Sequence, residues 1–150
     1  MSSQSSSPGF ASAEAAELGF YAAFERGDIA AMIAVWSEDP DISCIHPMGP
    51  VLRGPSAIGD SWRQILAPQH RLRITLSHQV VFSDAHLCVH CVHENIHHGD
   101  RFEDLSVIIA TNAYRFDGQG WRMILHHASP GARPARAPSV EPVPPDRAVH

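Results

Sequence analysis

The chain has 150 residues, a formal net charge of −5 and no lysine. A chain of this length forms one domain, which buries roughly 68–70% of its unfolded surface. The negative charge and the scattered arginines exclude a nucleic-acid partner, because phosphate backbones are bound mainly by clustered Lys and Arg. No run of 18 apolar residues occurs, so the sequence predicts no membrane-spanning segment.

The cysteine content indicates the compartment. Cys44, Cys88 and Cys91 are too few, and odd in number, for a disulfide framework, which favours a reducing environment. Residues 1–9 are serine-rich and lack the basic start and the apolar stretch of a secretory signal. We therefore expect a cytoplasmic protein.

Both ends of the chain differ in composition from the middle. Residues 1–10 are predicted to form a disordered tail. The segment from Pro130 to His150 is rich in proline and has too few large apolar side chains to offset the entropy of ordering it, so it is predicted to be a second disordered tail. A proline-rich ligand for a partner protein is the alternative. The folded domain is predicted over residues 11–129.

Within that domain the apolar pattern changes from helical to alternating near residue 70, which predicts helices first and a sheet second. Ser12 is the predicted cap of a helix that ends at Gly27, and Asp28 is the cap of a second helix that ends at Asp39-Pro40. The remaining predicted elements are short strands at 42–46 and 51–53, a helix beginning at Gly54-Pro55, and strands at 71–82, 85–97, 105–116 and 121–128.

This order, ααββαββββ, predicts an α+β fold of cone shape. Three helices pack on a strongly curved mixed or antiparallel sheet and leave a cavity inside the bend. In the last strand Trp121, Met123, Leu125 and His127 share one phase of the two-residue repeat. This pattern predicts a cavity wall on which His127 points inward and His126 points away.

Four segments carry a family resemblance. They are Phe20-Tyr-Ala-Ala-Phe-Glu-Arg-Gly-Asp28, Cys44-Ile-His-Pro-Met-Gly49, Gly54 before Ile58 and Trp62, and Gly120-Trp-Arg-Met-Ile-Leu-His-His-Ala-Ser129. In this order they resemble a SnoaL-like member of the nuclear transport factor 2-like superfamily, over roughly residues 11–129. The superfamily hosts isomerases, polyketide cyclases, dehydratases, transport factors and assembly domains, so the resemblance implies the cone fold without selecting one function.

The resemblance places His46 at a catalytic position. In ketosteroid isomerases of this superfamily an Asp-Pro-x-Gly segment supplies the general base, and the matching segment here is His46-Pro47-Met48-Gly49. An imidazole suits the task because its pKa lies near neutrality; the alternative is a histidine hydrogen-bonded within the fold. The isomerase tyrosine falls on Phe20, with Tyr21 turned about 100° around the helix. Together with the lack of a match for the assisting aspartate, this disfavours steroid isomerisation.

Glu94 is the predicted partner of His46. It shares a strand phase with Cys88, His90 and Val92. If that phase faces the cavity, burial raises the pKa of Glu94 into a useful range. If it faces outward, Glu94 is a solvated residue or a dimer contact. In the next strand Asn112 is predicted to orient a ligand carbonyl, with backbone capping as the alternative.

Aromatic and polar side chains complete the predicted cavity wall. Each lies on the inward face of its helix or strand. One side of each side chain packs in the core, and the other side contacts the ligand. The predicted ligand-binding residues are Phe20, Phe24, Trp36, Trp62, His90, Asn112 and Trp121.

Two motifs imitate metal or redox sites. His93-Glu-Asn-Ile-His97 matches the zinc-peptidase pattern, but that chemistry needs a helix, and on the predicted strand the two histidines lie about 13 Å apart. Cys88 and Cys91 point to opposite faces of the same strand, unlike a redox pair. We expect no metal and no cofactor. The open alternative is a metal site assembled across strands from His46, His86, His90, His126 or His127.

The leading prediction is a SnoaL-like protein that binds a small apolar carbonyl compound. If it is an enzyme, it catalyses metal-free isomerisation, cyclisation or dehydration, with His46 as base and Glu94 or His127 as acid or orienting group. The alternative is a non-catalytic ligand-binding or assembly domain. A homodimer through the exposed sheet face is expected.

Overall fold

The computed structural model describes residues 8–68 and 72–133. Of the predicted tails at 1–10 and 130–150, the parts at 1–7 and 134–150 lie outside the described residues, as does the predicted strand start at Arg71. At the described ends, Phe10 forms a β-bridge with Trp121, and the Arg133 guanidinium donates to the carbonyl oxygens of Glu103 and Leu105. Both of these ends therefore pack against the sheet.

The three helices begin where their caps predict. Helix α1 (Ala13–Arg26) follows Ser12, whose side chain accepts a hydrogen bond from the Ala15 amide, and it ends at Gly27 with φ 64°. Helix α2 (Ile29–Val35) is capped by Asp28, and helix α3 (Gly54–Leu66) has proline in its first turn. The predicted end of α2 at Asp39-Pro40 is wrong, because Trp36 leaves the helix to bridge Met123 in the sheet.

Within the described residues, six strands form one mixed sheet in the order β2-β1-β6-β5-β4-β3. Only β1 and β6 run parallel; every other neighbouring pair is antiparallel. A short 3₁₀ helix (Phe102–Asp104) precedes β5. The predicted α+β order ααββαββββ is confirmed. The strands are β1 (Ser43–Ile45), β2 (Val51–Arg53), β3 (Arg73–Ser83), β4 (Leu87–His97), β5 (Leu105–Phe116) and β6 (Trp121–Pro130).

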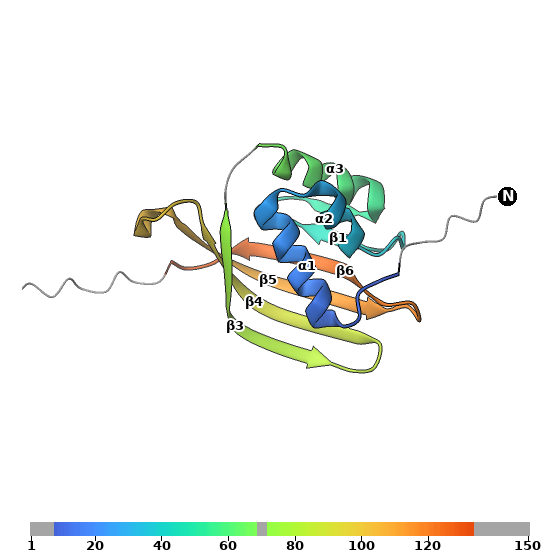
Figure 1. Ribbon diagram of the computed structural model, residues 1–150. Helices are drawn as coiled ribbons and strands as arrows, with labels where there is room; N and C mark the ends of the chain where they lie inside the picture. Colours follow the sequence, from blue (N-terminus) through green and yellow to red (C-terminus); the bar gives the residue numbers. More distant parts are fainter. Residues whose placement is uncertain (1–7, 69–71, 134–150) are drawn as a thin grey trace, which may run out of the picture.

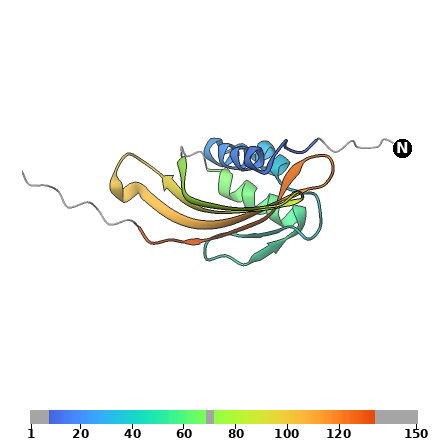
Figure 2. The ribbon, with the colours of Figure 1, turned by 90° about the horizontal axis from the view of Figure 1, so that it is seen from below.

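The helices gather on one side of the curled sheet, with α1 lying across β4 to β6 (Figure 1 and Figure 2). The core lies between the two layers, where Phe20, Met32, Trp62 and Tyr114 are at most 1% exposed. In β4 the phase that contains Glu94 is the buried one. Glu94 therefore points toward the helices, on the inward face of the strand.

A β-bulge in β6 decides which histidine faces inward. The pairing with β5 runs from Ala113 opposite Leu125 to Tyr114 opposite Met123, so Ile124 is an extra residue. After the bulge the phase is reversed: His126 is 2% exposed, while His127 lies on the open face. The prediction of an inward His127 and an outward His126 is wrong, because it assumed an uninterrupted two-residue repeat.

A second bulge lies in β3. The pairing with β4 shifts between Ser77 and Val80, and His78 adopts φ 53° at this point. The predicted apolar face of this strand is therefore wrong beyond the bulge: Ile74 is buried, but Val80 and Phe82 are 50% and 62% exposed. These two side chains lie on the sheet face opposite the helices.

No described helix is both long enough and apolar enough to span a bilayer.

Candidate functional site: an acid-base cavity

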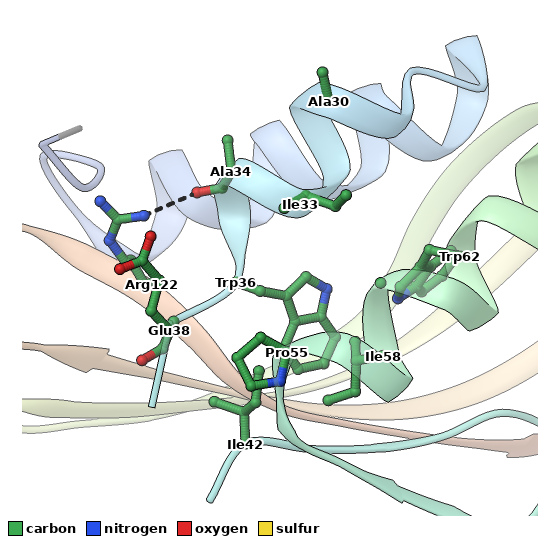
Figure 3. Close-up of a pocket in the computed structure, with 12 residues that line it drawn as sticks. Ala30, Ile33, Ala34, Trp36, Glu38, Ile42, Pro55, Ile58, Trp62 and Arg122 are labelled. Carbon is green, nitrogen blue, oxygen red and sulfur yellow. Dashed lines mark hydrogen bonds between the residues drawn. The ribbon is translucent and has the colours of Figure 1, made fainter. Parts of the chain in front are cut away.

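Trp62 lines two of the cavities in the described part of the chain. The larger, about 270 Å³, opens between α2 and α3; its walls include Trp36, Ile58 and Trp62, with Glu38 and Arg122 at one end (Figure 3). The smaller, about 160 Å³, contains three ionisable groups, His46, Glu94 and His126. We consider the smaller cavity the candidate site, because acid-base chemistry needs convergent titratable groups and the larger cavity has no histidine or buried carboxylate. The smaller cavity is lined by Phe24, His46, Pro47, Trp62, Ile65, Glu94, Ile96, Ile108, His126 and Ala128.

His46 follows β1 and is held by α3. The Ser61 hydroxyl donates to the Ile58 carbonyl at 2.8 Å and has no second proton to give. The 3.0 Å contact between His46 Nε2 and Ser61 Oγ is therefore donated by the imidazole, which leaves the lone pair on Nδ1. Burial lowers the pKa of His46, so the ring is neutral near pH 7 and able to accept a proton.

Glu94 projects from the middle of β4 toward α1. The Tyr21 hydroxyl donates to Glu94 Oε2 at 2.5 Å. Burial raises the pKa of Glu94 to about 7, and the hydrogen bond from Tyr21 lowers it only in part. Near neutral pH the acid and the carboxylate are therefore both populated, as proton transfer in either direction requires.

Asn112 and His126 extend the contact of Glu94 into a continuous chain. Asn112 Nδ2 donates to the Tyr21 hydroxyl at 2.8 Å, and Asn112 Oδ1 lies 2.6 Å from His126 Nδ1. Because a carbonyl oxygen only accepts, His126 Nδ1 carries the ring proton and Nε2 has the lone pair. Burial, aided by His46 and His127, lowers the pKa of His126 to about 3, so this ring is neutral at physiological pH.

A second buried cluster lies one turn earlier on α1. Glu17 accepts from His90 Nδ1 at 2.6 Å and from Gln79 Nε2 at 2.7 Å. On the other side of the ring, His90 Nε2 is 3.2 Å from Cys88 Sγ. The structure thus places His90, a predicted ligand-binding residue, in this cluster and on neither of the two cavities.

The other predicted site residues lie in different parts of the fold. Four of them line the smaller cavity, and Trp36 lines the larger one. Phe20 packs behind the site, with its ring centroid 5.0 Å from that of His126. Asn112 holds the hydrogen-bond chain, Trp121 packs against Phe116, and His127 points away. The four cavity residues are His46, Glu94, Phe24 and Trp62.

Sequence reasoning missed Tyr21, His126 and Ser61. Tyr21 is one residue from the position of the isomerase tyrosine, yet its hydroxyl reaches the network from the neighbouring face of α1. Its donor is committed to Glu94, so it differs from a tyrosine that donates to a substrate. The sequence offers one signal for Ser61, which is its place directly before the predicted wall residue Trp62. The structure shows that Ser61 lies on the α3 face above His46.

Comparisons with known proteins give a consistent family. The SnoaL-like domain model matches residues 14–133. A crystal structure from Thiobacillus denitrificans ATCC 25259, provisionally named a calcium/calmodulin-dependent protein kinase type II association domain, is 40% identical with a TM-score of 0.73, covering 83% of this chain and 99% of its own. A dehydratase, also provisionally named, of the NTF2-like family from Streptomyces avermitilis is 29% identical with a TM-score of 0.68, covering 77% and 91%.

A more distant structure shows the same fold. A provisionally named ketosteroid isomerase from Parabacteroides distasonis ATCC 8503 is 17% identical with a TM-score of 0.64, covering 79% of this chain and 86% of its own. The comparison with curated protein sequences gives no match. The chain belongs to the SnoaL-like domain family, within the nuclear transport factor 2-like superfamily.

Proposed function

We propose that the smaller cavity binds a small apolar carbonyl compound and catalyses its isomerisation, cyclisation or dehydration by proton transfer, without a cofactor. The observation that carries the proposal is the convergence of His46, Glu94 and His126 on one cavity in complementary protonation states. Each of these groups has a pKa shifted by burial in the direction that its role requires.

The roles follow from the proton positions. His46 Nδ1 takes a proton from the carbon next to the carbonyl group. Glu94, in its protonated form, gives a proton to the carbonyl or to a leaving hydroxyl group, so that the charges in the cavity balance. His126 Nε2 accepts a hydrogen bond from the substrate and stays neutral throughout. The chain through Asn112 and Tyr21 holds His126 and Glu94 in fixed orientations.

The size of the cavity limits the substrate. A buried apolar cavity of about 150 Å³ holds one benzene molecule, and the volume here is about 160 Å³. The substrate part that enters is therefore on the order of six to eight non-hydrogen atoms. A steroid nucleus is too large, in agreement with the departures from the isomerase motif. The provisional name of the Streptomyces avermitilis relative, a dehydratase, fits the same class of reaction.

A hydrogen-exchange experiment tests the proposal without knowing the product. A panel of small ketones and β-hydroxy carbonyl compounds is incubated in heavy water with the protein, and loss of the α-proton is followed by NMR. His46→Gln and Glu94→Gln should each lower the exchange rate by about 10²–10⁴-fold, the usual contribution of one acid or base. His127→Gln is the matched control on the opposite face and should leave the rate unchanged. If His46→Gln and Glu94→Gln exchange the α-proton as fast as His127→Gln does, neither His46 nor Glu94 takes part in the proton transfer.

The second candidate function is a non-catalytic association domain that forms a homodimer through the sheet. The Thiobacillus denitrificans relative carries an association-domain name, and the face opposite the helices exposes Val80, Phe82 and Ile109 at 50%, 62% and 41%. Apolar groups gathered on one face favour contact with a second copy.

Sedimentation analysis separates the two candidates. Phe82→Asp should convert a dimer to a monomer, whereas Leu18→Asp, a 72% exposed residue on α1, should leave the mass unchanged. A monomeric native protein contradicts the association role. A dimer that shows no exchange with any compound in the panel favours it over catalysis.

A further inference from the structure

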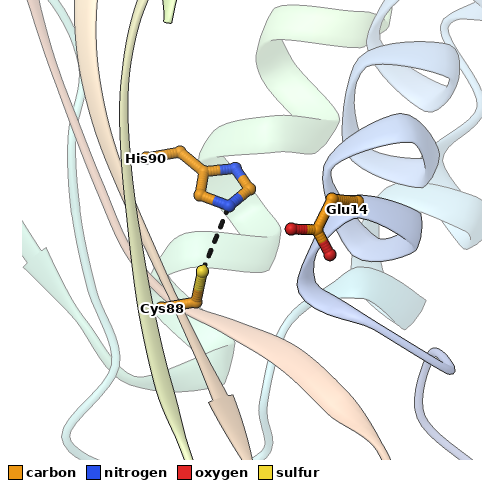
Figure 4. Close-up of side chains that lie close together, drawn as sticks. All are labelled: Glu14, Cys88 and His90. Carbon is orange, nitrogen blue, oxygen red and sulfur yellow. Dashed lines mark hydrogen bonds between the residues drawn. The ribbon is translucent and has the colours of Figure 1, made fainter. Parts of the chain in front are cut away.

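We infer that Glu14, Cys88 and His90 form a binding site for a divalent transition-metal ion of the Zn²⁺ class (Figure 4). This inference does not depend on the proposed function, because the three residues line neither cavity. The sequence left open a metal site assembled from histidines on different strands, including His90. The site inferred here keeps His90 and has a cysteine and a glutamate in place of further histidines.

The ligand atoms are already close together. One atom from each residue lies within 4.8 Å of the other two, and Cys88 Sγ is 3.2 Å from His90 Nε2. With Zn–S near 2.3 Å and Zn–N near 2.0–2.1 Å, two such atoms on a tetrahedral ion are roughly 3.5 Å apart. Cys88 and His90 are two residues apart in β4 and therefore point to the same side. Small side-chain rotations are enough to admit the ion.

The imidazole is fixed from behind as in established zinc sites. Glu17 accepts the Nδ1 proton of His90 at 2.6 Å, and Gln79 donates to the other oxygen of the same carboxylate at 2.7 Å. This places the lone pair of His90 on Nε2, which faces Cys88 and Glu14. A carboxylate behind a histidine ligand sets its tautomer and increases its basicity toward the metal.

The charges around the site favour a cation. Two carboxylates lie at the site, because Glu14 offers a ligand atom beside Cys88 and His90, and Glu17 is hydrogen-bonded to His90. When the ion binds, the thiol proton passes to solvent and a sulfur–metal bond replaces the S–H bond. Thiolate, imidazole and carboxylate together suit a borderline ion such as Zn²⁺. Because Glu14 is exposed at the start of α1, a water molecule has access to the fourth position.

The order Cys88, His90, Glu17 would also suit a thiol nucleophile with its base. A nucleophile needs room for an organic substrate beside the sulfur. Cys88 is 2% exposed and lines neither of the two cavities beside Trp62. A single ion needs far less space, so the geometry favours a metal.

Cobalt titration of the untagged full chain tests the site. Thiolate coordination to Co²⁺ produces a charge-transfer absorption band, which the other histidines of the chain cannot produce. The intact protein should show the band, and added Zn²⁺ should abolish it. Cys91→Ser, on the opposite face of β4, and Cys44→Ser, beside His46, are the matched controls and should retain the band.

Two variants locate the ion. Cys88→Ser should eliminate the band. Glu14→Gln changes only an exposed side chain, so the protein remains folded, and its Co²⁺ affinity should fall at least 10–100-fold, the loss expected even for an outer partner of a metal ligand. Zn²⁺ should raise the unfolding temperature of the intact protein much more than that of Glu14→Gln, because a ligand stabilises the state that binds it.

Three results would overturn the site: no charge-transfer band, a band that persists in Cys88→Ser, or unchanged Co²⁺ affinity in Glu14→Gln. Alkylation of Cys88 by a small reagent in the metal-free native protein, faster than that of Cys91, would favour the nucleophile instead. None of these readouts involves turnover in the acid-base cavity, so failure of the metal site and failure of the proposed function are distinguishable.

Discussion

Glu94 makes the stability of the domain depend on pH. Its pKa rises from 4.5 in the unfolded reference to about 7 in the folded protein. Between these values the folded state holds a proton that the unfolded state has released. The contribution of Glu94 to stability is therefore full below 4.5 and is lost as pH rises through 7.

Glu94→Gln should remove this dependence. At 1.36 kcal/mol per unit of pKa, the free energy of unfolding of the native protein should fall by about 3 kcal/mol relative to the variant across that window. Urea unfolding of both proteins on either side of the window measures the difference. Asp60→Asn, an exposed carboxylate on α3, is the control. A difference that stays constant with pH would mean that the pKa of Glu94 is the same in the folded and the unfolded state.

His126 acts in the opposite direction. Its pKa falls from 6.5 to about 3 on folding, so its contribution to stability is present above 6.5 and is lost as pH falls toward 3. His126→Gln should therefore lose less stability on acidification than the native protein, as measured by thermal unfolding at a series of pH values. His127→Gln, on the exposed side of the same strand, should follow the native curve. If both variants behave alike, His126 is not buried in its neutral form.

Single residues were predictable where they depend on local pattern alone. His46 was predicted at the cavity from the resemblance of its His-Pro-x-Gly segment to that of the isomerases, and the alternating pattern grouped Glu94 with Cys88 and His90 without deciding whether that face points inward. Tyr21 and His126 could not be predicted, because their positions depend on tertiary contacts. A side chain as long as tyrosine reaches over a neighbouring helix face, and the histidine owes its orientation to a bulge.

At the scale of elements, the bulge at Ile124 determines the chemistry of β6. It increases the local twist and allows Met123 and His126, three residues apart, to face the same side. Nothing in Met123-Ile-Leu-His126 differs from an ordinary buried strand, since no glycine or other turn-forming residue marks the extra position. The caps of α1 and α2, by contrast, were predictable because Ser12, Gly27 and Asp28 each satisfy helix-end groups by themselves.

The β5–β6 turn has no room for an added methyl group at Gly120. Gly120 has φ 152°, and a Cβ atom there would lie 2.5 Å from the backbone of Gly9. Gly120→Ala should destabilise the domain by about 1–3 kcal/mol, the usual cost of backbone strain, and should weaken the bridge between Phe10 and Trp121. Chemical unfolding measures the loss, and hydrogen exchange of the Phe10 amide reports the bridge.

Gly59→Ala, within α3, is the control for this substitution. Alanine favours a helix interior over glycine by about 1 kcal/mol, and its new methyl group would meet the flexible guanidinium of Arg63 at 3.4 Å and Ile33 Cδ1 at an ordinary contact distance of 3.9 Å. Its stability should be unchanged or increased. If Gly120→Ala has the same free energy of unfolding as the native protein, the bridge between Phe10 and Trp121 can shift without loss of stability.

At the scale of the whole molecule, the eleven histidines control charge. The formal charge is −5 with neutral histidines, and the sequence pI is about 6.1. Protein molecules associate most readily where their net charge is zero. We expect light scattering to be greatest near pH 6.1 and to fall on both sides. Because burial lowers the pKa values of His46 and His126, the rise in positive charge below that point is smaller than composition predicts.

The overall architecture was predictable because the spacing of apolar residues changes once, from helical to alternating, and because turn residues mark nearly every boundary between elements. The site was predictable only in part, since it joins side chains that the sheet brings together from distant positions. Single residues of the larger cavity and of the second cluster, Trp36 and His90, were predicted as wall residues, but no local pattern showed which side chains they would meet.

The long sequence separation of the hydrogen-bonded pairs has a consequence for synthesis. Tyr21 and Glu94 are 73 residues apart, and Tyr21 and Asn112 are 91 apart. While the chain emerges from the ribosome, α1 is complete long before its partners exist, so Glu17 and Tyr21 remain in water until β4 and β5 arrive. Since β6 supplies His126 last, the site is expected to close only after the whole domain has left the exit tunnel.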